Sequence, residues 1–369
     1  MGLQQEIDLA RKDIRTDAYS ISIGEWISIY EKGEIDIHPE FQRFFRWTEY
    51  QKSRLIESIF LGIPIPQIFV AQRTDGVWDV VDGLQRLSTI YQFAGILKDE
   101  DGRKIEPLVL EATKYLPSLK NHKWDDPHDP SHSLDASQRL LIKRVSIGVS
   151  IILRESEQMA KYELFQRLNT GGSLLSDQEV RNAILVMINR EFYHWLREIS
   201  RDTSFMECAA VSDRAADEQY DMELALRFLI FRQMSNTEFK KLGDLGDFLT
   251  DKAATIAEDK TYDREEATCA LRNTFSILHQ ELGSDAFRRY DPTRQRFVGG
   301  FSVSAFEAVT LGVDHNYKAI QKRKNRLRLR DKVQEIWSDP EFTDNSGSGV
   351  RASTRLPKIV PYGRRHFRP

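Results

Sequence analysis

A change of hydrophobic period between residues 76 and 97 constrains the fold more than any other feature of this sequence. The stretch "GVWDVVDG" has the apolar character of a strand, and "LQRLSTIYQFAGIL" after it spaces its apolar residues as a helix does. Before this strand, "RTDG" has the composition of a hairpin turn and follows the apolar run "IPIPQIFVAQ". A hairpin that leads directly into a helix predicts an α+β unit with a strand-to-helix junction at residues 82–86.

The pattern of apolar residues and capping signals divides the rest of the chain into predicted helices and strands. Helices are predicted at 20–33, where Ser22 is a cap, and at 48–62, where Thr48 and Gln51 form a capping box. Short strands are predicted near 35–39 and 146–153, whereas the pattern after about residue 190 is helical. We therefore expect an α+β domain with a small mixed sheet over residues 1–185, an all-helical domain over 186–340, and a basic tail containing Gly and Ser over 341–369.

Composition excludes several classes of protein. The chain has 369 residues, 40% hydrophobic and 30% charged, with a formal net charge of -3, which is typical of a soluble globular protein. Cys208 and Cys269 form neither a disulfide framework nor a zinc-binding pair. Because no segment has the apolar length of a membrane span or of a signal peptide, we expect a cytoplasmic protein without membrane contact.

The junction "DGLQR" carries more polar groups than a turn requires. A helix N-terminus favours an anion through its unpaired N–H groups, and Gly83 allows close approach of the backbone. Arg86 has a planar fork that matches phosphate oxygens, Gln85 can orient a water, and Asp82 can hold a metal ion or accept a proton. The alternative is a capped helix start, with Asp82 as the N-cap and Arg86 on the surface.

A second stretch, "PEFQRFFRW" at 39–47, places arginines among aromatic residues. Gln42, Arg43 and Arg46 in this setting favour stacking on a base or contact with phosphate. The alternative is a loop whose aromatic side chains fill the core while its arginines reach solvent.

A third stretch, "FQRLNTGGSLLSDQEVRNAI" at 165–184, joins two predicted helices. Asn169, Gly171 and Gly172 either bring polar groups to a site or supply a left-handed turn. Ser176 and Glu179 have the spacing of a capping box, which is the more ordinary reading of Glu179.

A basic run, "KAIQKRKNRLRLRDK" at 318–332, and the terminal "GRRHFRP" suggest contact with phosphates of DNA. The alternative is a solvated helix face. The candidate DNA-binding residues are Lys322, Arg323, Lys324, Arg326, Arg328 and Arg330.

Together these stretches resemble the GmrS-type domain of the GmrSD modification-dependent (type IV) restriction enzymes. The family pattern is matched in order by "PEFQRFFRW", "SIFLGIPIP", "DGLQR", "FQRLNTGGSLL" and "EVRN" over residues 39–182. The resemblance implies a ParB/sulfiredoxin-like α+β fold with an attached helical region, and an antiviral defence role.

The resemblance also implies binding of an NTP, with ATP, GTP, CTP and UTP not distinguished. The carboxylate of Asp82 is the candidate ligand of a Mg²⁺ ion bound with the phosphates. Three residues of the junction would be catalytic in an NTPase: Asp82, Gln85 and Arg86. The nucleotide-binding residues carried over by position are Gln42, Arg43, Gly83, Arg86, Asn169, Gly171 and Gly172. Arg46 joins this set because it lies among the aromatic residues of the first stretch.

Two departures from the family pattern shape the functional expectation. Leu84 stands where relatives usually have a glutamine, which puts hydrolysis in question more than binding. Longer relatives carry an HNH nuclease, and the scattered histidines after residue 190 lack the grouping that its metal site needs. We therefore expect a separate HNH nuclease as partner and foreign or modified DNA as the target.

Three functional hypotheses remain open from the sequence. The first is a defence subunit that binds and hydrolyses an NTP and regulates a partner nuclease. The second is a DNA-binding module without catalysis. The third is a ParB-like nuclease with Asp82 and Glu179 as metal ligands. A homo-oligomer is compatible with each of them.

Overall fold

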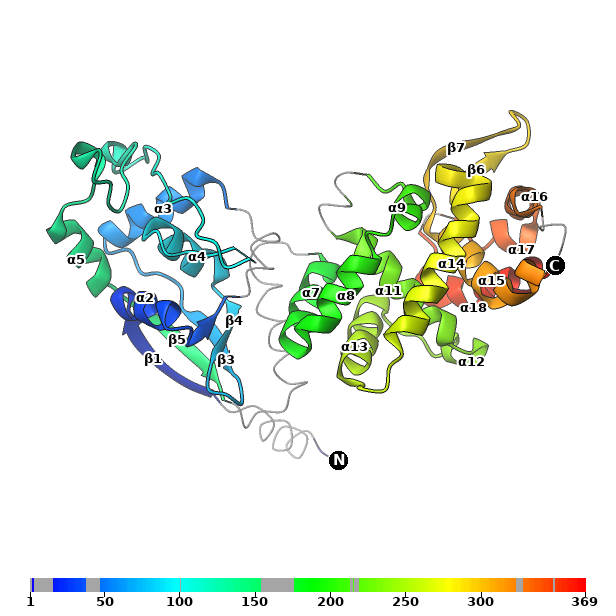
Figure 1. The fold of residues 1–369 in the computed structure, drawn as a ribbon, viewed down its shortest axis with the longest axis horizontal. Helices are drawn as coiled ribbons and strands as arrows, with labels where there is room; N and C mark the ends of the chain where they lie inside the picture. The colour runs from blue at the N-terminus through cyan, green and yellow to red at the C-terminus, as the bar shows by residue number, and fades with distance from the viewer. Residues whose placement is uncertain are drawn as a thin grey trace. The chain divides into compact units, whose positions relative to one another are not determined.

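The chain is described from a computed structural model that covers residues 2, 16–37, 47–99, 101–153, 176–212, 215, 219–322, 328–347 and 349–369. It divides into two compact units, Met1–Leu175 and Ser176–Pro369. Figure 1 labels the helices and strands of each unit. The units are described separately below.

The first unit contains a small mixed sheet in the order β1-β5-β3-β4-β2. Neighbouring strands alternate between antiparallel and parallel pairing, since β1–β5 and β3–β4 are antiparallel while β5–β3 and β4–β2 are parallel. The strands are β1 Thr16–Ser22, β2 Ile35–Asp36, β3 Ile68–Gln72, β4 Trp78–Asp82 and β5 Ser146–Ile152. The predicted α+β class with a small mixed sheet is confirmed, including the hairpin between β3 and β4.

Four helices of this unit contact one another and form a layer on the sheet (Figure 1). They are α2 Ile23–Glu31, α3 Glu49–Phe60, α4 Leu84–Phe93 and α5 Ala136–Arg144. Local signals explain where three of them begin, because Ser22, Thr48 and Asp135 each accept a hydrogen bond from a backbone N–H of the first turn. The N-cap of helix α4 is Gly83, which has no side chain to make such a bond.

The core of the first unit lies between the helices and the sheet. Trp26, Ile68, Val70 and Leu87 are fully buried there. Each such apolar side chain contributes about 1.5–3 kcal/mol relative to an exposed one. This packing fixes β4 and α4, and therefore the junction between them.

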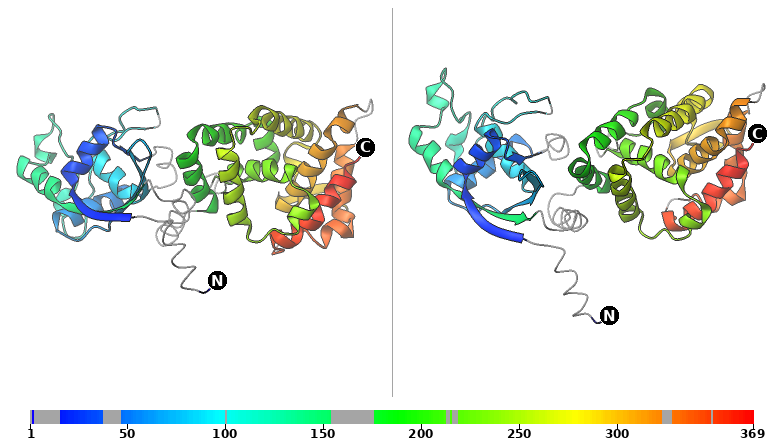
Figure 2. Two further views of the ribbon diagram at one scale, coloured as in Figure 1. Left: turned by 90° about the horizontal axis from the view of Figure 1, so that it is seen from below. Right: turned by 60° about the horizontal axis from the view of Figure 1, so that its bottom comes forward.

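The second unit is a helical assembly that contains one short hairpin. Its longer helices are α7 Asp177–Ile188, α8 Arg190–Ile199, α9 Thr203–Ala209, α11 Tyr220–Gln233, α13 Leu245–Glu258, α14 Arg264–Leu282, α15 Val303–Lys322, α16 Leu329–Glu335 and α18 Ala352–His366. Shorter pieces are α12 Asn236–Phe239 and α17 Pro340–Thr343. Figure 2 shows these helices from two further directions.

The hairpin is the main departure from the all-helical expectation for this region. It consists of β6 Arg288–Asp291 and β7 Arg296–Phe301, paired antiparallel. Only four and six residues form these strands, so their alternation of polar and apolar residues is too short to stand out in the sequence.

The segment 341–369, predicted as a basic tail, instead contains α17 and α18. Helix α18 packs against α15 so closely that two glycines face the contact. A Cβ on Gly363 would lie 2.2 Å from the carbonyl oxygen of Ala308, and one on Gly312 would lie 2.6 Å from the carbonyl oxygen of Gly363. Although this segment is basic in composition, its helix α18 is therefore part of the core.

Candidate functional site

The junction between β4 and α4 is built around Gly83. This residue is the N-cap of α4 and has a φ of 98°, which favours glycine over any residue with a side chain. A Cβ at this position would lie 2.3 Å from Cδ1 of Ile68, which is fully buried in β3. The glycine is thus required by its left-handed backbone and by contact with β3, whatever ligand the junction binds.

Arg86 reaches back from α4 and holds three chain segments together. Its Nη2 donates to Oδ2 of Asp82 at 2.8 Å, and its Nη1 donates to the carbonyl oxygens of Pro66 and Gln67 at 2.7 and 3.1 Å. The Arg86 side chain is only 12% exposed, whereas that of Asp82 is 34% exposed. The Arg86 guanidinium is therefore mostly buried in the junction, and its three hydrogen bonds fix its orientation.

Gln85 links the junction to the end of the "PEFQRFFRW" stretch. Its Oε1 accepts a hydrogen bond from the backbone N–H of Trp47 at 3.3 Å. Two of the predicted motifs therefore meet at this point, although they are 38 residues apart in sequence. The other residues predicted from the first of these motifs, Gln42, Arg43 and Arg46, lie outside the described residues.

Leu84, the residue that departs from the family pattern, is buried. Its side chain enters the core rather than the junction.

The alternative interpretation of the junction, a helix start with Asp82 as the N-cap and Arg86 on the surface, is wrong in both respects. Asp82 is not the N-cap of α4, since that position belongs to Gly83. Arg86 is not a free surface side chain, because it is mostly buried and bonded to β4 and to the segment before β3. The sequence signal that was missed is the pair of carbonyls at Pro66 and Gln67, which the motif "IPIPQ" places beside Arg86.

The third stretch lies only in part within the described residues. Asn169, Gly171 and Gly172 fall outside them. Ser176 caps α7, and Oε2 of Glu179 accepts from the Ser176 N–H at 2.8 Å, which confirms the capping box. The Glu179 carboxylate is therefore used in the cap.

Arg181, from the same stretch, starts a chain of buried charges in the second unit. It contacts Glu223 at 3.5 Å, and Glu223 pairs with Arg227 at 2.5 Å. Arg227 contacts Glu307 at 3.3 Å, and Glu307 accepts two hydrogen bonds from Arg355 at 2.9 and 3.0 Å. These alternating charges connect α7, α11, α15 and α18.

Burial and ion pairing shift the pKa values of the arginines in this network in opposite directions. Burial lowers the pKa of Arg181 below its ordinary value, and Glu223 offsets this in part. Burial also acts to lower the pKa of Arg227, but the carboxylates of Glu223 and Glu307 outweigh it and raise that pKa. The network therefore has a structural role, because every member is paired within the folded unit.

The basic run predicted to bind DNA is only partly described. Lys322 is the exposed last residue of α15, and Arg328 is exposed at the start of α16. Arg330 lies over the Phe297 ring, 5.4 Å from its centroid, and contacts Asp285 at 3.4 Å. Arg323, Lys324 and Arg326 lie outside the described residues.

The terminal "GRRHFRP" patch is largely committed to internal contacts. Arg364 donates to the carbonyl oxygens of Phe231 and Met234 at 3.2 and 3.0 Å, and Arg365 pairs with Glu341. These contacts fasten α18, so this patch is less available to a partner than its composition indicates.

The described ranges contain neither a cluster of potential metal ligands nor a helix suited to cross a membrane. No group of three or more His, Cys, Asp or Glu side chains is placed there to hold a metal ion. No helix in those ranges combines the length and the apolar content that crossing a membrane requires.

Comparison with known proteins gives one match. Residues 23–186, somewhat under half of the chain, match the family model described as "GmrSD restriction endonuclease, N-terminal domain". The matched region includes the whole β4–α4 junction and ends within α7. Comparison with curated proteins and with solved structures gives no match.

Proposed function

Because residues 23–186 are a GmrSD-type restriction-enzyme N-terminal domain, we propose that this chain is the nucleotide-binding, regulatory component of a restriction system. The domain supports a restriction or defence-related role and implies interaction with DNA. Nucleotide binding at the β4–α4 junction is the finer part of the proposal. It is supported by the geometry of the junction.

One observation carries this part of the proposal. Gly83, the N-cap of α4, has no side chain to make a capping bond, while the N-cap residues of the other three helices of its layer each make one. An uncapped N-terminus presents backbone N–H groups and the positive end of the helix dipole. Arg86 lies beside it with its guanidinium held in place by Asp82 and two carbonyls. A phosphate group would accept hydrogen bonds from N–H groups of the first turn and from the guanidinium.

Asp82 fits the role of a Mg²⁺ ligand in such a site. Magnesium in nucleotide sites is usually held by one or two carboxylates together with the phosphates, rather than by a full protein cage. Oδ2 of Asp82 is bonded to Arg86, and the side chain is partly exposed. Asp82 would therefore hold the ion jointly with the phosphates, and the ion would neutralise part of their charge.

The proposal extends to NTP hydrolysis. As the alternative to holding the ion, Asp82 would accept a proton from the attacking water. Gln85 would orient that water, and Arg86 would stabilise the charge that develops on the phosphate. Gln85 is already positioned by its contact with Trp47. The nucleotide state would then regulate a separate HNH nuclease that cleaves foreign or modified DNA.

The test is a titration of the protein with ATP, GTP, CTP and UTP, with and without Mg²⁺. A charge-assisted hydrogen bond contributes about 1.5–3 kcal/mol, so Arg86→Gln should weaken binding by roughly 10- to 100-fold. Release of inorganic phosphate measures hydrolysis separately.

Arg139 offers a matched control within the same unit. Its Nη1 also donates to two carbonyl oxygens, those of Trp124 and Leu134, and contacts Asp125. Arg139→Gln should therefore perturb the fold to a similar degree and leave nucleotide affinity unchanged. Equal affinity of wild type and Arg86→Gln for every nucleotide would remove the proposal.

A second candidate function is a DNA-binding module without catalysis. It is favoured by the exposed positions of Lys322 and Arg328. It predicts DNA binding that weakens steeply as salt rises and that does not depend on nucleotide. A salt series with and without NTP separates it from the first candidate.

A further inference from the structure

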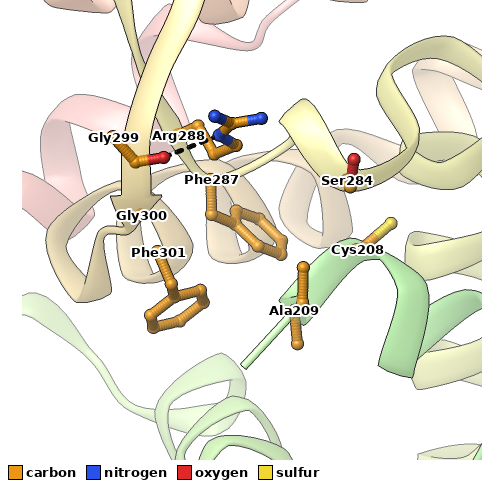
Figure 3. A pocket seen from close by; sticks show the side chains of 9 residues that line it. Cys208, Ala209, Ser284, Phe287, Arg288, Gly299, Gly300 and Phe301 are labelled. Atoms are coloured by element: carbon orange, nitrogen blue, oxygen red, sulfur yellow. Dashed lines mark hydrogen bonds between the residues drawn. The ribbon is translucent and has the colours of Figure 1, made fainter. Parts of the chain in front are cut away.

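The β6–β7 hairpin is firmly attached to the second unit at its base. Figure 3 shows Phe287 and Phe301 on the same side of the base, and the Arg288 Nε donating to the carbonyl oxygen of Gly299 at 2.8 Å. Phe287 is buried and packs edge-on against Phe306 of α15. The hairpin therefore extends from a rigid base.

The two faces of the hairpin differ in chemistry. Tyr290 and Phe297 are cross-strand partners with ring centroids 5.2 Å apart, and Phe297 is buried against the unit. Because side chains alternate along a strand, Arg289 and Arg296 share the opposite face, and both are exposed. As diagonal neighbours they are separated by about 7–8 Å.

Neither arginine of this face is neutralised within the described part of the chain, where no ion pair involves Arg289 or Arg296. One acidic residue, Asp291, lies on this face directly opposite Arg296, whereas Asp331, Glu335 and Asp339 line the surface next to Tyr290. Net positive charge is thus presented on the face of Arg289 and Arg296.

The tip of the hairpin adds a third arginine in an ordered turn. Asp291 lies opposite Arg296, but its Oδ1 accepts from the backbone N–H groups of Thr293 and Arg294 at 2.9 and 3.1 Å. Arg294 remains 65% exposed, with Asp291 at 3.6 Å. These bonds order the backbone of the turn that carries Arg294 before any partner binds, which lowers the entropy cost of binding.

The basic run found in the sequence continues this surface. Arg330 at the start of α16 lies over the ring of Phe297, so α16 is next to β7. Arg328, two residues before it, is 89% exposed. Basic side chains from two segments well separated in the sequence therefore lie on neighbouring elements.

From these observations we infer that the β6–β7 hairpin is a DNA-contacting element, with Arg289, Arg294 and Arg296 on the phosphates of duplex DNA. A two-stranded ribbon has the width of the major groove, and arginines on its outer face reach the phosphates that border it. This inference rests on the DNA-directed part of the proposed function. It does not depend on nucleotide binding.

The test measures binding of the full chain to a labelled duplex of about 25 base pairs over a salt series. The triple variant Arg289→Ala/Arg294→Ala/Arg296→Ala should bind more weakly, and the slope of log K against log salt should fall by about 0.9 for each phosphate that the variant no longer neutralises. A control variant, Lys240→Ala/Lys241→Ala/Lys260→Ala, removes the same charge from exposed positions of the same unit. Circular dichroism checks that both variants are folded.

The possible outcomes test the hairpin inference separately from the proposed nucleotide site. A reduced slope in the hairpin variant, with the control close to wild type, supports the inference. Equal slopes in the two variants overturn it, as does a preference for single strands that survives loss of the hairpin arginines. If the wild-type chain binds no DNA while NTP titration still shows binding, the hairpin inference fails and the nucleotide site stands.

Discussion

Arg355→Ala is the substitution that probes the second unit most sharply. Arg355 lies in α18, within the segment whose composition suggests a tail, and its guanidinium donates to both oxygens of Glu307. It also donates to the carbonyl oxygen of Val350 at 3.0 Å. The Glu307 side chain is 0% exposed, so the substitution removes one of the cations that neutralise a fully buried carboxylate.

The magnitude follows from what Glu307 retains. Removing one partner of a buried ion pair costs about 3–5 kcal/mol, since the other charge stays buried. Glu307 keeps a contact with Arg227 at 3.3 Å, so we expect a value near the lower limit, about 3 kcal/mol. In a unit of this size that corresponds to a fall in melting temperature of roughly 6–12 °C.

Arg365→Ala is the matched control, because Arg365 lies in the same helix and also pairs with a glutamate. That pair is exposed, with side-chain exposures of 55% for Arg365 and 53% for Glu341, and its loss should cost about 0–1 kcal/mol. Scanning calorimetry of the full chain measures both variants. If Arg355→Ala melts within about a degree of Arg365→Ala, the assignment of α18 to the core is refuted.

Three further predictions concern single positions. Gly83→Ala should lower the stability of the first unit by at least about 1 kcal/mol, because the left-handed backbone alone costs a non-glycine residue that much, and urea unfolding measures it. Asp82→Asn frees Arg86 of a competing carboxylate, so affinity for NTP without Mg²⁺ should rise while the gain from adding Mg²⁺ should shrink; no change in either affinity would contradict the assigned roles. Burial raises the pKa of the Cys208 thiol to about 12, so little thiolate is present at about pH 8 and iodoacetamide should label only the exposed Cys269 in the native chain, as intact mass would show. Labelling of both thiols before unfolding would contradict this.

Local signals in the sequence were sufficient for the helix starts and for the strand-to-helix junction. The caps at Thr48 and Ser176 depend on residues three positions apart, so the sequence alone predicts them. The same holds for the hairpin between β3 and β4, whose turn residues lie next to each other in the chain.

Contacts between distant residues were beyond such reasoning. Arg86 bonds to carbonyls about twenty positions earlier, so its partial burial does not follow from its neighbours. Arg355 pairs with a glutamate 48 positions away, which turns a residue of apparently basic tail character into a core residue. The composition of a segment shows how many charged residues it has but not which residues they pair with. Ion pairs in the folded chain determine which arginines remain available to ligands.

The central claim is that the start of α4 binds the phosphates of a nucleotide. The most direct measurement is a crystal structure of the chain with a non-hydrolysable triphosphate and Mg²⁺. We predict phosphate oxygens within hydrogen-bonding distance of the Arg86 guanidinium and of backbone N–H groups in the first turn of α4. A triphosphate bound elsewhere, with the Arg86 contacts to Asp82 and Pro66 unchanged and no ligand at the junction, would contradict the account.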